Sequence, residues 1–589
     1  MAHTDTADVL IVGAGPVGLS AAAELARHGV RGRVIDRLPA RLPYAKAVGI
    51  QPRTLELWDR MGLVRDILET AVPLRGQLAY VNGVAQPRLD LVLPPEVPYG
   101  FAALPQYETE RLLEEYLAGL GVAVERGTEL TSFCQDPDGV TACLTTASGD
   151  EEEVRVGHLV GCDGAHSTVR KGLGLSFEGA ALPQEYMLAD VEVDWEMPPG
   201  FSVRSTHRAE GGSIDDALVC VPLPGANRYR LSMLAPPGRT TGPAGRPRPD
   251  QDPPGAARGA AGTDDAGQVA HGLGGSRVPA LSDIQAVVDR LVPTGAALSA
   301  LRWSSVFRIS HRIVDRYGEG RVFVAGDAAH IHPPTGAQGM NTGIQDACNL
   351  AWKLALVVHR AAAPALLATY DAERRPVGEE VVGRTTVRHS SDGSQLGTGD
   401  DPHTLILREA QLLVGYRQGP LATRPYGPAD APQPGDRAPD CAGLTAPPLA
   451  AYEMRLLDVL RGCPGHVVLL YLSDPDDAAA AAAAAGAVAA SGLLPAAPAS
   501  PAARPTRTVA IVTREADPSV SGAVSALSEL SRLPVPGYLD TAGEFARLYR
   551  PGGPTGFVIR PDGQLGARFP LSGAGAALRD YLTALSMAA

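Results

Sequence analysis

Apolar and polar positions at the start of the chain follow the order strand, helix, strand. The β-branched run DVLIV (8–12) predicts a buried strand, and residues 15–29 carry a helix-forming pattern that stops at Gly29. GRVIDR (32–37) predicts a second strand. Because a helix that crosses over between two strands makes them parallel, this pattern predicts the first βαβ unit of an open α/β sheet.

Alternation with a period of two dominates the middle of the chain. After an amphipathic helix at 105–121, residues 122–164 predict a small antiparallel sheet that ends in the buried strand HLVGC. Residues 179–310 are strand-like at both ends and predict a second, mainly β domain. Its segment 236–280 is rich in Gly, Pro, Ala and Arg and cannot bury enough apolar surface to order itself, so it predicts a mobile surface insertion.

The C-terminal part predicts long helices, a linker and a separate domain. Helical patterns run from about 340 to 362 and again from residue 368, and a Pro/Gly-rich linker occupies 418–438. Residues 439–589 then alternate strands and helices, interrupted by an alanine-rich run at 476–494 that we interpret as low complexity. The predicted domains are 1–178 with 311–417 (α/β), 179–310 (mainly β) and 439–589 (α/β).

Composition narrows the class of protein without identifying it. A chain of 589 residues, 45% of them hydrophobic and with a mean hydropathy of −0.01, has the size of about two to four globular domains. The net charge of −13 argues against a nucleic-acid partner, and the absence of a secretory signal or apolar span favours a cytoplasmic protein without a membrane partner. The seven cysteines include no CxxC pair, so neither a zinc site nor a dithiol centre is expected.

The residues that carry chemistry begin with Gly13-x-Gly15-x-x-Gly18, between the first predicted strand and the first predicted helix. Its glycines allow a tight turn and let a pyrophosphate approach the helix N-terminus, where backbone N–H groups stabilise negative charge. Asp36 closes the second strand, where an acid can accept hydrogen bonds from ribose hydroxyls. The alternative is an ordinary glycine turn with a surface aspartate, which the order of strand, motif and helix disfavours.

Two further motifs follow later predicted strands. Asp163 and Gly164 end the strand HLVGC, and the alternative role for Asp163 is the cap of a short helix. Gly326 and Asp327 end RVFVAGD, so Asp327 emerges at the carboxyl edge of the sheet, where ligands bind in open α/β folds. The loop PPTGAQGMN (333–341) then permits close approach to a planar ligand, and the helix after it offers its positive end.

The order GxGxxG, DG and GD resembles that of the FAD-dependent monooxygenases of the para-hydroxybenzoate hydroxylase type. Over about residues 5–400 the chain looks most similar to the aromatic-polyketide hydroxylases and the pentachlorophenol-monooxygenase-like enzymes. The resemblance implies a Rossmann-like FAD-binding domain with an inserted, mainly β substrate domain. Residues 434–440 and 549–569 resemble a C-terminal thioredoxin-like α/β domain. Because Cys463 stands alone there, a structural or dimerisation role is expected, and with it a homodimer.

The resemblance assigns most of these residues to FAD. The glycine motif and Asp36 would bind the adenosine half, Asp163 would serve both FAD and NAD(P)H, and Asp327 would hold the ribitol. Pro333 and residues 336–339 would lie beside the isoalloxazine ring. The expected cofactor residues are Gly13, Gly15, Pro16, Gly18, Asp36, Arg37, Lys46, Arg53, Gln106, Asp163, Gly326, Asp327, Pro333, Gly336, Gly339, Met340 and Asn341.

Segment 45–63 resembles a mobile-flavin loop of that family. Arg53 stands at the family's usual arginine, whereas Lys46 replaces an arginine of many members and so loses bidentate geometry. Gln106 lies at a position that contacts FAD in relatives, although polarity of a helix surface is the alternative for Arg53 and Gln106. Some phenol-hydroxylating relatives carry an acid where this chain has Val48, so a carboxylate base is missing there.

Three residues are the catalytic candidates. Pro333 would lie beside the flavin, and Tyr229 and Arg417 are candidates for polarising a phenol, with a satisfied strand tyrosine and a surface arginine as the alternatives. His330 and His332 stand two residues apart, but no third ligand is near in sequence, so no metal site is expected.

The reaction that the resemblance implies is hydroxylation of a small phenolic or polycyclic aromatic substrate, such as an aromatic polyketide. NADPH or NADH would reduce FAD, and molecular oxygen would add to form a C4a-hydroperoxyflavin that transfers one oxygen atom. The chain has no second GxGxxG motif, which fits a nicotinamide cofactor that reacts and leaves. Baeyer–Villiger oxidation or epoxidation on the same fold, and an FAD-binding protein without turnover, remain the alternatives.

Overall fold

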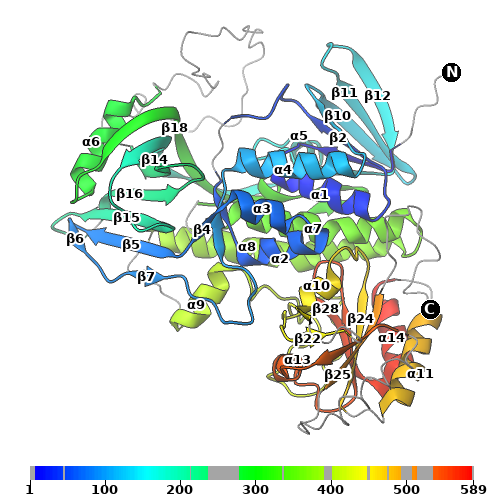
Figure 1. Cartoon of the computed structure of the whole chain (residues 1–589). Coiled ribbons are helices and arrows are strands. Elements are labelled where there is room, and N and C mark those ends of the chain that lie inside the picture. Colours follow the sequence, from blue (N-terminus) through cyan, green and yellow to red (C-terminus); the bar gives the residue numbers. More distant parts are fainter. Residues whose placement is uncertain are drawn as a thin grey trace. The chain divides into compact units, whose positions relative to one another are not determined.

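The computed structural model divides the chain into two compact units (Figure 1). One comprises residues 1–70, 92–179 and 311–589, and the other comprises 71–91 and 180–310. The second unit thus takes a segment that the sequence pattern placed in the first domain. The structure describes residues 7–43, 47–212, 214–235, 278–333, 337–390, 401–446, 452–473, 477–491, 507–513 and 535–586.

The first unit contains a sheet of six described strands in the order β19-β20-β13-β1-β2-β9. The strands from β20 to β9 run parallel, and the register pairs Val9 with both His158 and Gly32. The predicted βαβ unit is therefore present, and the α/β fold class is confirmed. The strands are β1 (Val9–Val12), β2 (Gly32–Asp36), β9 (Val124–Arg126), β13 (His158–Gly161), β19 (Gly318–Glu319) and β20 (Val322–Val324).

Helix α1 (Pro16–Arg27) packs closely against α7 (Gly339–Val358) and against α4 (Gln106–Gly119). Small residues permit this approach, because a Cβ on Gly343 of α7 would lie 2.7 Å from Cγ2 of Val17. The predicted small antiparallel sheet is present as β10 (Glu129–Asp136), β11 (Gly139–Thr145) and β12 (Glu151–Val156). The other elements here are β3 (Gly49–Ile50), α2 (Pro52–Met61), α3 (Val64–Thr70), β8 (Phe101–Ala103), α5 (Thr168–Gly172), β21 (His330–Ile331), α8 (Ala368–Ser390) and α9 (Pro402–Glu409).

The second unit is mainly β, and one described helix (α6, Leu281–Leu291) packs against its strands. The alternating residues Met187, Ala189 and Val191 of β14 are buried together with Ile284 and Val288 of that helix, which gives the unit its own core. Of the predicted insertion, residues 236–277 lie outside the described residues. The elements are β4 (Val72–Leu74), β5 (Gly76–Val81), β6 (Val84–Ala85), β7 (Leu89–Asp90), β14 (Phe177–Asp194), β15 (Phe201–Arg208), β16 (Ile214–Pro222), β17 (Arg228–Leu234), α6 (Leu281–Leu291) and β18 (Ala297–Val314).

The C-terminal part of the first unit forms its own sheet, in the order β23-β22-β26-β25-β24-β27-β28. Strands β24, β25 and β26 are parallel, and β27 runs antiparallel to β24. The thioredoxin-like resemblance stays a prediction. The elements are β22 (Leu444–Thr445), β23 (Glu453–Met454), α10 (Leu456–Leu460), β24 (Val467–Leu472), α11 (Ala478–Ala490), β25 (Arg507–Thr513), β26 (Gly537–Asp540), α13 (Glu544–Tyr549), β27 (Thr555–Ile559), β28 (Leu565–Pro570) and α14 (Ala574–Ala584).

Both faces of this C-terminal sheet are buried. Val468 and Leu470 of β24 pack on one side with α11 and α14, while Leu469 packs on the other with α10 and α13. The alanine-rich run that the sequence pattern marked as low complexity therefore has a structural role. It forms α11, which buries Ala481 and Val488, because alanine is the best helix former and its small side chain allows close packing.

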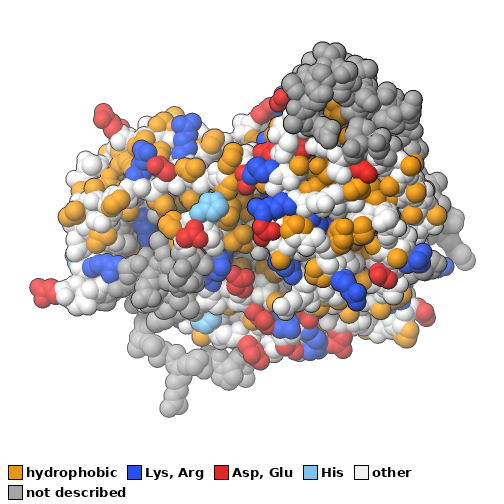
Figure 2. All heavy atoms as spheres, turned by 90° about the horizontal axis from the view of Figure 1, so that it is seen from below, with side chains coloured by type: hydrophobic (Ala, Val, Ile, Leu, Met, Phe, Trp, Pro, Cys, Tyr) orange, Lys and Arg blue, Asp and Glu red, His pale blue; other side chains and the backbone are white. Residues whose placement is uncertain are grey.

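One face of the surface and the described helices can be compared with the expected partners. On the face drawn in Figure 2, acidic and basic side chains are interspersed and hydrophobic ones are scattered between them. No continuous basic band of the kind that favours a nucleic-acid backbone is visible among the coloured residues of that face. Within the described residues, every helix is too short or too polar to cross a membrane.

Candidate cofactor site

The GxGxxG motif, the Asp163–Gly164 motif and the Gly326–Asp327 motif meet at one edge of the parallel sheet. They follow β1, β13 and β20, which are neighbours, so their carboxyl ends lie side by side. A Cβ on Gly13 would clash with the carbonyl of Cys162, and a Cβ on Gly326 would lie 2.8 Å from Val17. The first two motifs therefore approach each other through their backbones, and the third lies against the side chain of Val17.

The glycine turn leaves room for an anion in front of α1. Gly13 has a φ of +102°, and a Cβ on Gly18 would clash with the Gly13 carbonyl, so neither position tolerates a side chain. A Cβ on Gly15 would meet nothing within 4 Å. Gly15 is also the N-cap of α1, and no described side chain caps that helix. The helix dipole and its first N–H groups thus face open space, as a pyrophosphate site requires.

Asp36 holds the glycine turn in place. Its Oδ2 accepts a hydrogen bond from the Ala14 amide at 2.7 Å, and its Oδ1 accepts one from the Leu38 amide at 2.8 Å. Arg126 approaches Oδ2 at 3.7 Å. Each carboxylate oxygen has two lone pairs, so Asp36 keeps acceptor capacity for ribose hydroxyls. The neighbouring Arg37, also a predicted cofactor residue, is exposed.

Asp163 combines the two roles that the sequence left open. Its Oδ2 accepts hydrogen bonds from the amides of Thr168 at 2.7 Å and Val169 at 3.2 Å, so it caps α5 together with Ser167. Its buried Oδ1 has no hydrogen-bond partner among the described residues, and burial raises the pKa of this carboxyl. A buried polar atom without a partner is costly, so a ligand hydroxyl or amide that donates to Oδ1 would be stabilised there.

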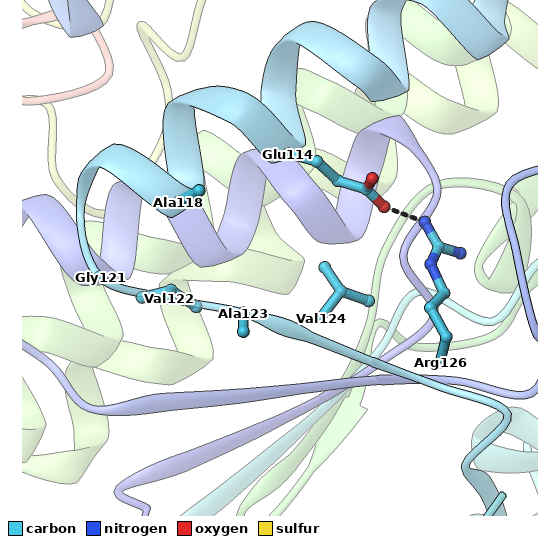
Figure 3. Close-up of a pocket in the computed structure, with 7 residues that line it drawn as sticks. All are labelled: Glu114, Ala118, Gly121, Val122, Ala123, Val124 and Arg126. Carbon is cyan, nitrogen blue, oxygen red and sulfur yellow. Dashed lines mark hydrogen bonds and ion pairs between the residues drawn. The ribbon is translucent and has the colours of Figure 1, made fainter.

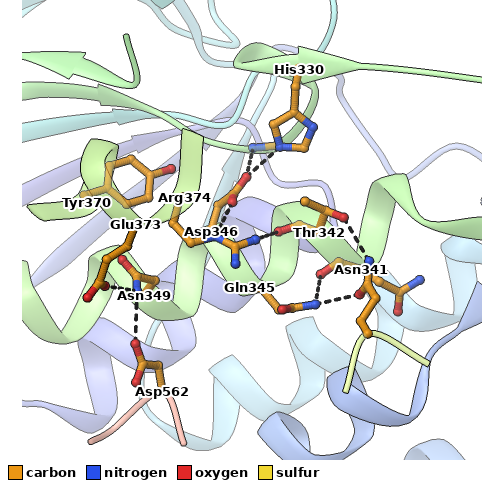
Figure 4. Close-up of polar contacts among 12 residues, drawn as sticks. His330, Asn341, Thr342, Gln345, Asp346, Asn349, Tyr370, Glu373, Arg374 and Asp562 are labelled. Carbon is orange, nitrogen blue, oxygen red and sulfur yellow. Dashed lines mark hydrogen bonds and ion pairs between the residues drawn. The ribbon is translucent and has the colours of Figure 1, made fainter. Parts of the chain in front are cut away.

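The turn that carries Asp327 is anchored by Asp346, a residue that motif matching missed (Figure 4). Asp327 itself is exposed. The fully buried Asp346 accepts hydrogen bonds from the Gly326 amide at 3.2 Å, from Nε2 of His330 at 2.8 Å and from Nε of Arg374 at 2.7 Å. Burial raises its pKa, but Arg374 and His330 outweigh burial and hold the pKa below its ordinary value. An anionic Asp346 therefore fixes the backbone next to Asp327.

The histidines of this loop serve its packing. His330 is bound to Asp346, and its ring stacks on that of His332 with centroids 6.5 Å apart. Nδ1 of His332 lies 2.8 Å from the carbonyl of the buried Pro333, and burial, above all, lowers the pKa of His332 to about 4. The described residues contain no cluster of three His, Cys, Asp or Glu side chains that could hold a metal. Of the predicted loop residues, Gly336 lies outside the described part.

Hydrogen bonds connect the start of α7 to the segment before α2. Gly339 and Met340 form its first turn, and the side chain of the buried Asn341 contacts backbone only. Asn341 accepts a hydrogen bond from the Gln51 amide at 2.9 Å and donates to the Gly49 carbonyl at 2.9 Å. Asn341, which is predicted to lie under the flavin, therefore also joins the start of α7 to residues 49–51.

The remaining predicted cofactor residues contact protein groups. Arg53 is buried, ion-paired with Glu56 at 2.9 Å, and donates to the carbonyl of Asp562 at 2.6 Å. Gln106 donates to Glu110 at 2.8 Å. Lys46 lies outside the described residues.

The two candidates for polarising a phenol each have protein partners within their own unit. Tyr229 belongs to the second unit, where its ring meets that of Trp195 edge-on at 4.9 Å and burial raises its pKa. Arg417 is more than half exposed and forms a bidentate ion pair with Asp436 at 2.6 and 2.7 Å.

A cavity of about 440 Å³ lies between the end of α4 and β9 (Figure 3). Its charged lining residues, Glu114 and Arg126, form an ion pair. None of its lining residues was predicted for the cofactor, and only Arg126 links it to Asp36. The lining residues are Glu114, Ala118, Gly121, Val122, Ala123, Val124 and Arg126.

Comparison with known proteins agrees with the geometry of the three motifs. The chain matches the family described as FAD binding domain over residues 6–254 and 276–385. It is 41% identical over 386 residues to a 6-methylpretetramide 4-monooxygenase of Streptomyces rimosus; this match covers 65% of the chain and 62% of that relative. A flavin-dependent monooxygenase of Mycobacteroides abscessus is 34% identical over 478 residues, 78% of this chain and 88% of the relative.

The fold agrees over nearly the whole length with a solved structure. The anhydrotetracycline hydroxylase OxyS of Streptomyces rimosus superposes with a TM-score of 0.66 at 26% identity, covering 99% of this chain and all of that one. The family resemblance expected from the order of the motifs is confirmed. The chain belongs to the FAD-dependent monooxygenases built on the FAD binding domain.

Proposed function

We propose that this protein is an NAD(P)H-consuming, FAD-dependent monooxygenase that hydroxylates a small phenolic or polycyclic aromatic substrate. The observation that carries the proposal is the meeting of the glycine turn, the Asp163 turn and the Gly326–Asp327 turn at one sheet edge. The names of the relatives support the reaction class, since one is a 6-methylpretetramide 4-monooxygenase and another an anhydrotetracycline hydroxylase.

The residues of the first unit fit FAD. The open space before Gly15 suits the pyrophosphate, Asp36 suits the ribose hydroxyls, and Asp327 suits the ribitol. The buried Oδ1 of Asp163 can accept one further hydrogen bond from the cofactor or from a nicotinamide nucleotide. When bound, FAD would be reduced by NADPH or NADH and would then activate molecular oxygen.

The surrounding residues supply position and electrostatics. The positive end of α7, which begins at Gly339, stabilises negative charge placed before it. Pro333 is buried and stiffens the loop that we assign to the isoalloxazine side. Asp346 keeps the Gly326–Asp327 turn in one conformation. A rigid, preorganised site of this kind lowers the cost of orienting the reacting groups.

We assign substrate binding to the second, mainly β unit. Tyr229 is the better candidate for contact with a phenol, because it lies in this unit and its hydroxyl, whose pKa burial raises further, can donate a hydrogen bond. Arg417 is the weaker candidate, since Asp436 already engages its guanidinium. Val48 is buried and provides no carboxylate, so a substrate phenol would lose its proton to water or to another group.

The test is substrate-stimulated oxidation of NADPH and NADH by the purified FAD-loaded chain. A panel of phenols and polycyclic quinones should contain at least one compound that raises the oxidation rate and gains one oxygen atom in mass spectrometry. The matched controls are Asp327→Asn, which should lose FAD and activity together, and Glu115→Gln, an exposed carboxylate on α4 that should behave as wild type.

The products decide between the remaining readings. A new hydroxyl on the ring supports the proposal. Oxygen inserted beside a ketone, or an epoxide, would replace hydroxylation by the corresponding reaction on the same site. Bound FAD without any compound that stimulates oxidation would make the protein an FAD-binding protein without turnover and would overturn the proposal.

A further inference from the structure

Helix α7 carries a ridge of buried polar side chains along one side. Asn341, Gln345, Asn349 and Lys353 stand four residues apart, so they lie one above another on the helix, and none is more than 5% exposed. The other residues of this part of the helix are buried as well, and they include the polar Thr342 and Asp346. Because burying polar groups without hydrogen bonds is costly, the ridge requires partners along its whole length.

One end of the ridge lies at the flavin motifs. Asn341 joins the start of α7 to the Gly49–Gln51 segment, directly before α2. One turn later Gln345 (labelled in Figure 4) points along the same side of α7. It donates to Gln411 at 2.6 Å, and Gln411 donates to Thr342 at 2.9 Å. Polar contacts thus join the first two turns of α7 at its cofactor end, whereas the next ridge residue, Asn349, has separate partners.

The other end of the ridge receives a turn of the C-terminal part. Arg560 forms a bidentate pair with Glu373 of α8, both bonds 2.7 Å long, and also binds Asp562 at 2.6 Å. Asn349 donates to Glu373 at 2.9 Å and to Asp562 at 3.0 Å, and Lys353 donates to Glu373 at 2.8 Å. Figure 4 shows Asn349 between Glu373 and Asp562. The positive charges of Lys353 and Arg560 thus balance the negative charges of two almost fully buried carboxylates.

The same turn is held from α2 as well. Arg53 donates to the carbonyl of Asp562 at 2.6 Å, and Arg60 donates to the carbonyl of Arg560 at 2.8 Å. Gly563 has a φ of +76°, and a Cβ on it would lie 3.0 Å from Nη2 of Arg53. The turn therefore bridges α2 and α7, the two helices whose cofactor ends Asn341 joins.

We propose that the Arg560–Gly563 turn of the C-terminal part is a positioning element of the FAD site. It holds α2 at Arg53 in the first turn and at Arg60 in the last turn, and it holds α7 at Asn349. Arg53 and helix α7 transmit this constraint to the Gly49–Gln51 segment and to the first turn of α7. Arg53 is accordingly a positioning residue rather than a ligand of FAD. The inference rests on the proposed FAD site and adds the C-terminal part to it.

The experiment measures FAD binding by the full-length apoprotein rather than turnover. The main variant pairs Glu373→Gln with Arg560→Met, which removes one charge of each sign and leaves Lys353 and Asp562 balanced. A second variant, Arg53→Met, leaves Glu56 paired with Arg437. The stability control is Ile511→Val, a small cavity in the C-terminal core that touches neither helix.

We expect the pair variant and Arg53→Met each to weaken FAD binding by about tenfold, the size of a coupling through packed elements. Their combination should weaken it no further, because both break the same brace. The visible absorption bands of the bound flavin should lose fine structure in both, while Ile511→Val should match wild type in affinity and spectrum. Gly563→Ala, which presses on Arg53 without changing charge, should act in the same direction.

Three results would overturn the inference. The first is wild-type binding of FAD by the pair variant or by a folded Gly563→Ala. The second is additive effects of the pair and of Arg53→Met, and the third is equally weakened binding in Ile511→Val. Additive effects would return Arg53 to direct contact with FAD. If the pair variant does not fold, Gly563→Ala and Arg53→Met decide. A wild-type chain that does not bind FAD would instead refute the proposed function, so the two failures are distinct.

Discussion

Glu110 on α4 offers a direct test of the electrostatics around the cofactor motifs. Its side chain is nearly buried and accepts the hydrogen bond of Gln106. Burial is the largest cause of a rise in its pKa from 4.5 to about 7; Gln106 and Arg126 lower the pKa, and Asp36 and Glu114 raise it further. The folded protein thus favours the protonated carboxyl, whereas the unfolded chain ionises it at its ordinary pKa.

The sign of the effect follows from proton binding. Between pH 4.5 and about 7 the folded chain keeps a proton on Glu110 that the unfolded chain releases. The contribution of Glu110 to stability is therefore complete below pH 4.5 and is lost as the pH rises through 7. A shift of this size corresponds to about 3 kcal/mol, at about 1.4 kcal/mol per pKa unit. Glu110→Gln keeps the acceptor for Gln106 but has no proton to lose.

Urea unfolding of the full chain, followed by intrinsic fluorescence between about pH 5 and pH 8, measures this difference. Glu110→Gln should gain about 3 kcal/mol of unfolding free energy relative to wild type over that range, most of it between pH 5 and pH 7. Glu115→Gln, on the same helix but exposed, should follow wild type throughout. A difference between Glu110→Gln and wild type that changes by less than about 1 kcal/mol would refute the burial argument.

Three further predictions concern the cofactor turns. Gly15→Ala should fold as wild type does, because a Cβ there meets no atom within 4 Å, yet it should weaken FAD binding in a titration of apoprotein by about tenfold. Gly18→Ala should lower the thermal unfolding midpoint, since its Cβ would clash with the Gly13 carbonyl; an unchanged midpoint would contradict this packing. Asp346→Asn should cost about 3–5 kcal/mol in unfolding free energy measured in urea, because it leaves the buried Arg374 without its carboxylate, and a loss below about 1 kcal/mol would show that the pair is unimportant.

The sequence predicts this fold and its cofactor turns because their signals are local. A glycine motif between a strand and a helix depends on backbone geometry within a few residues, and so does an aspartate at the end of a strand. Gly13, Asp163 and Asp327 could therefore be placed before their strands were known to be neighbours. The structure groups residues 71–91 with the second unit, because β5 pairs in parallel with β15, more than a hundred residues later, and no local pattern encodes that pairing.

The side chains that brace the site could not be predicted in the same way. Asp346 and Arg374 come from different helices, and an ion pair between them depends on how the helices pack. One signal was nevertheless present in the sequence: polar residues recur at intervals of four along one helix, at Asn341, Gln345, Asn349 and Lys353. The resemblance assigned Arg53 and Asn341 to FAD by position; their side chains hydrogen-bond to protein groups, and their contact with FAD stays a prediction.

In the C-terminal part, local sequence signals and contacts made by packing lead to the same conclusion. Its sequence has no pair of close cysteines, and in the structure Cys441 and Cys463 are buried, with burial raising the pKa of the Cys441 thiol. A buried thiol that resists ionisation is a poor nucleophile for disulfide exchange, so a redox role is disfavoured. Two polar side chains of this part are buried: Arg560 binds Glu373 of α8, and Asp562 accepts a hydrogen bond from Asn349 of α7. A buried, charge-balanced network adds little to stability compared with apolar packing but fixes one geometry, and that is the property a support for the flavin helices needs.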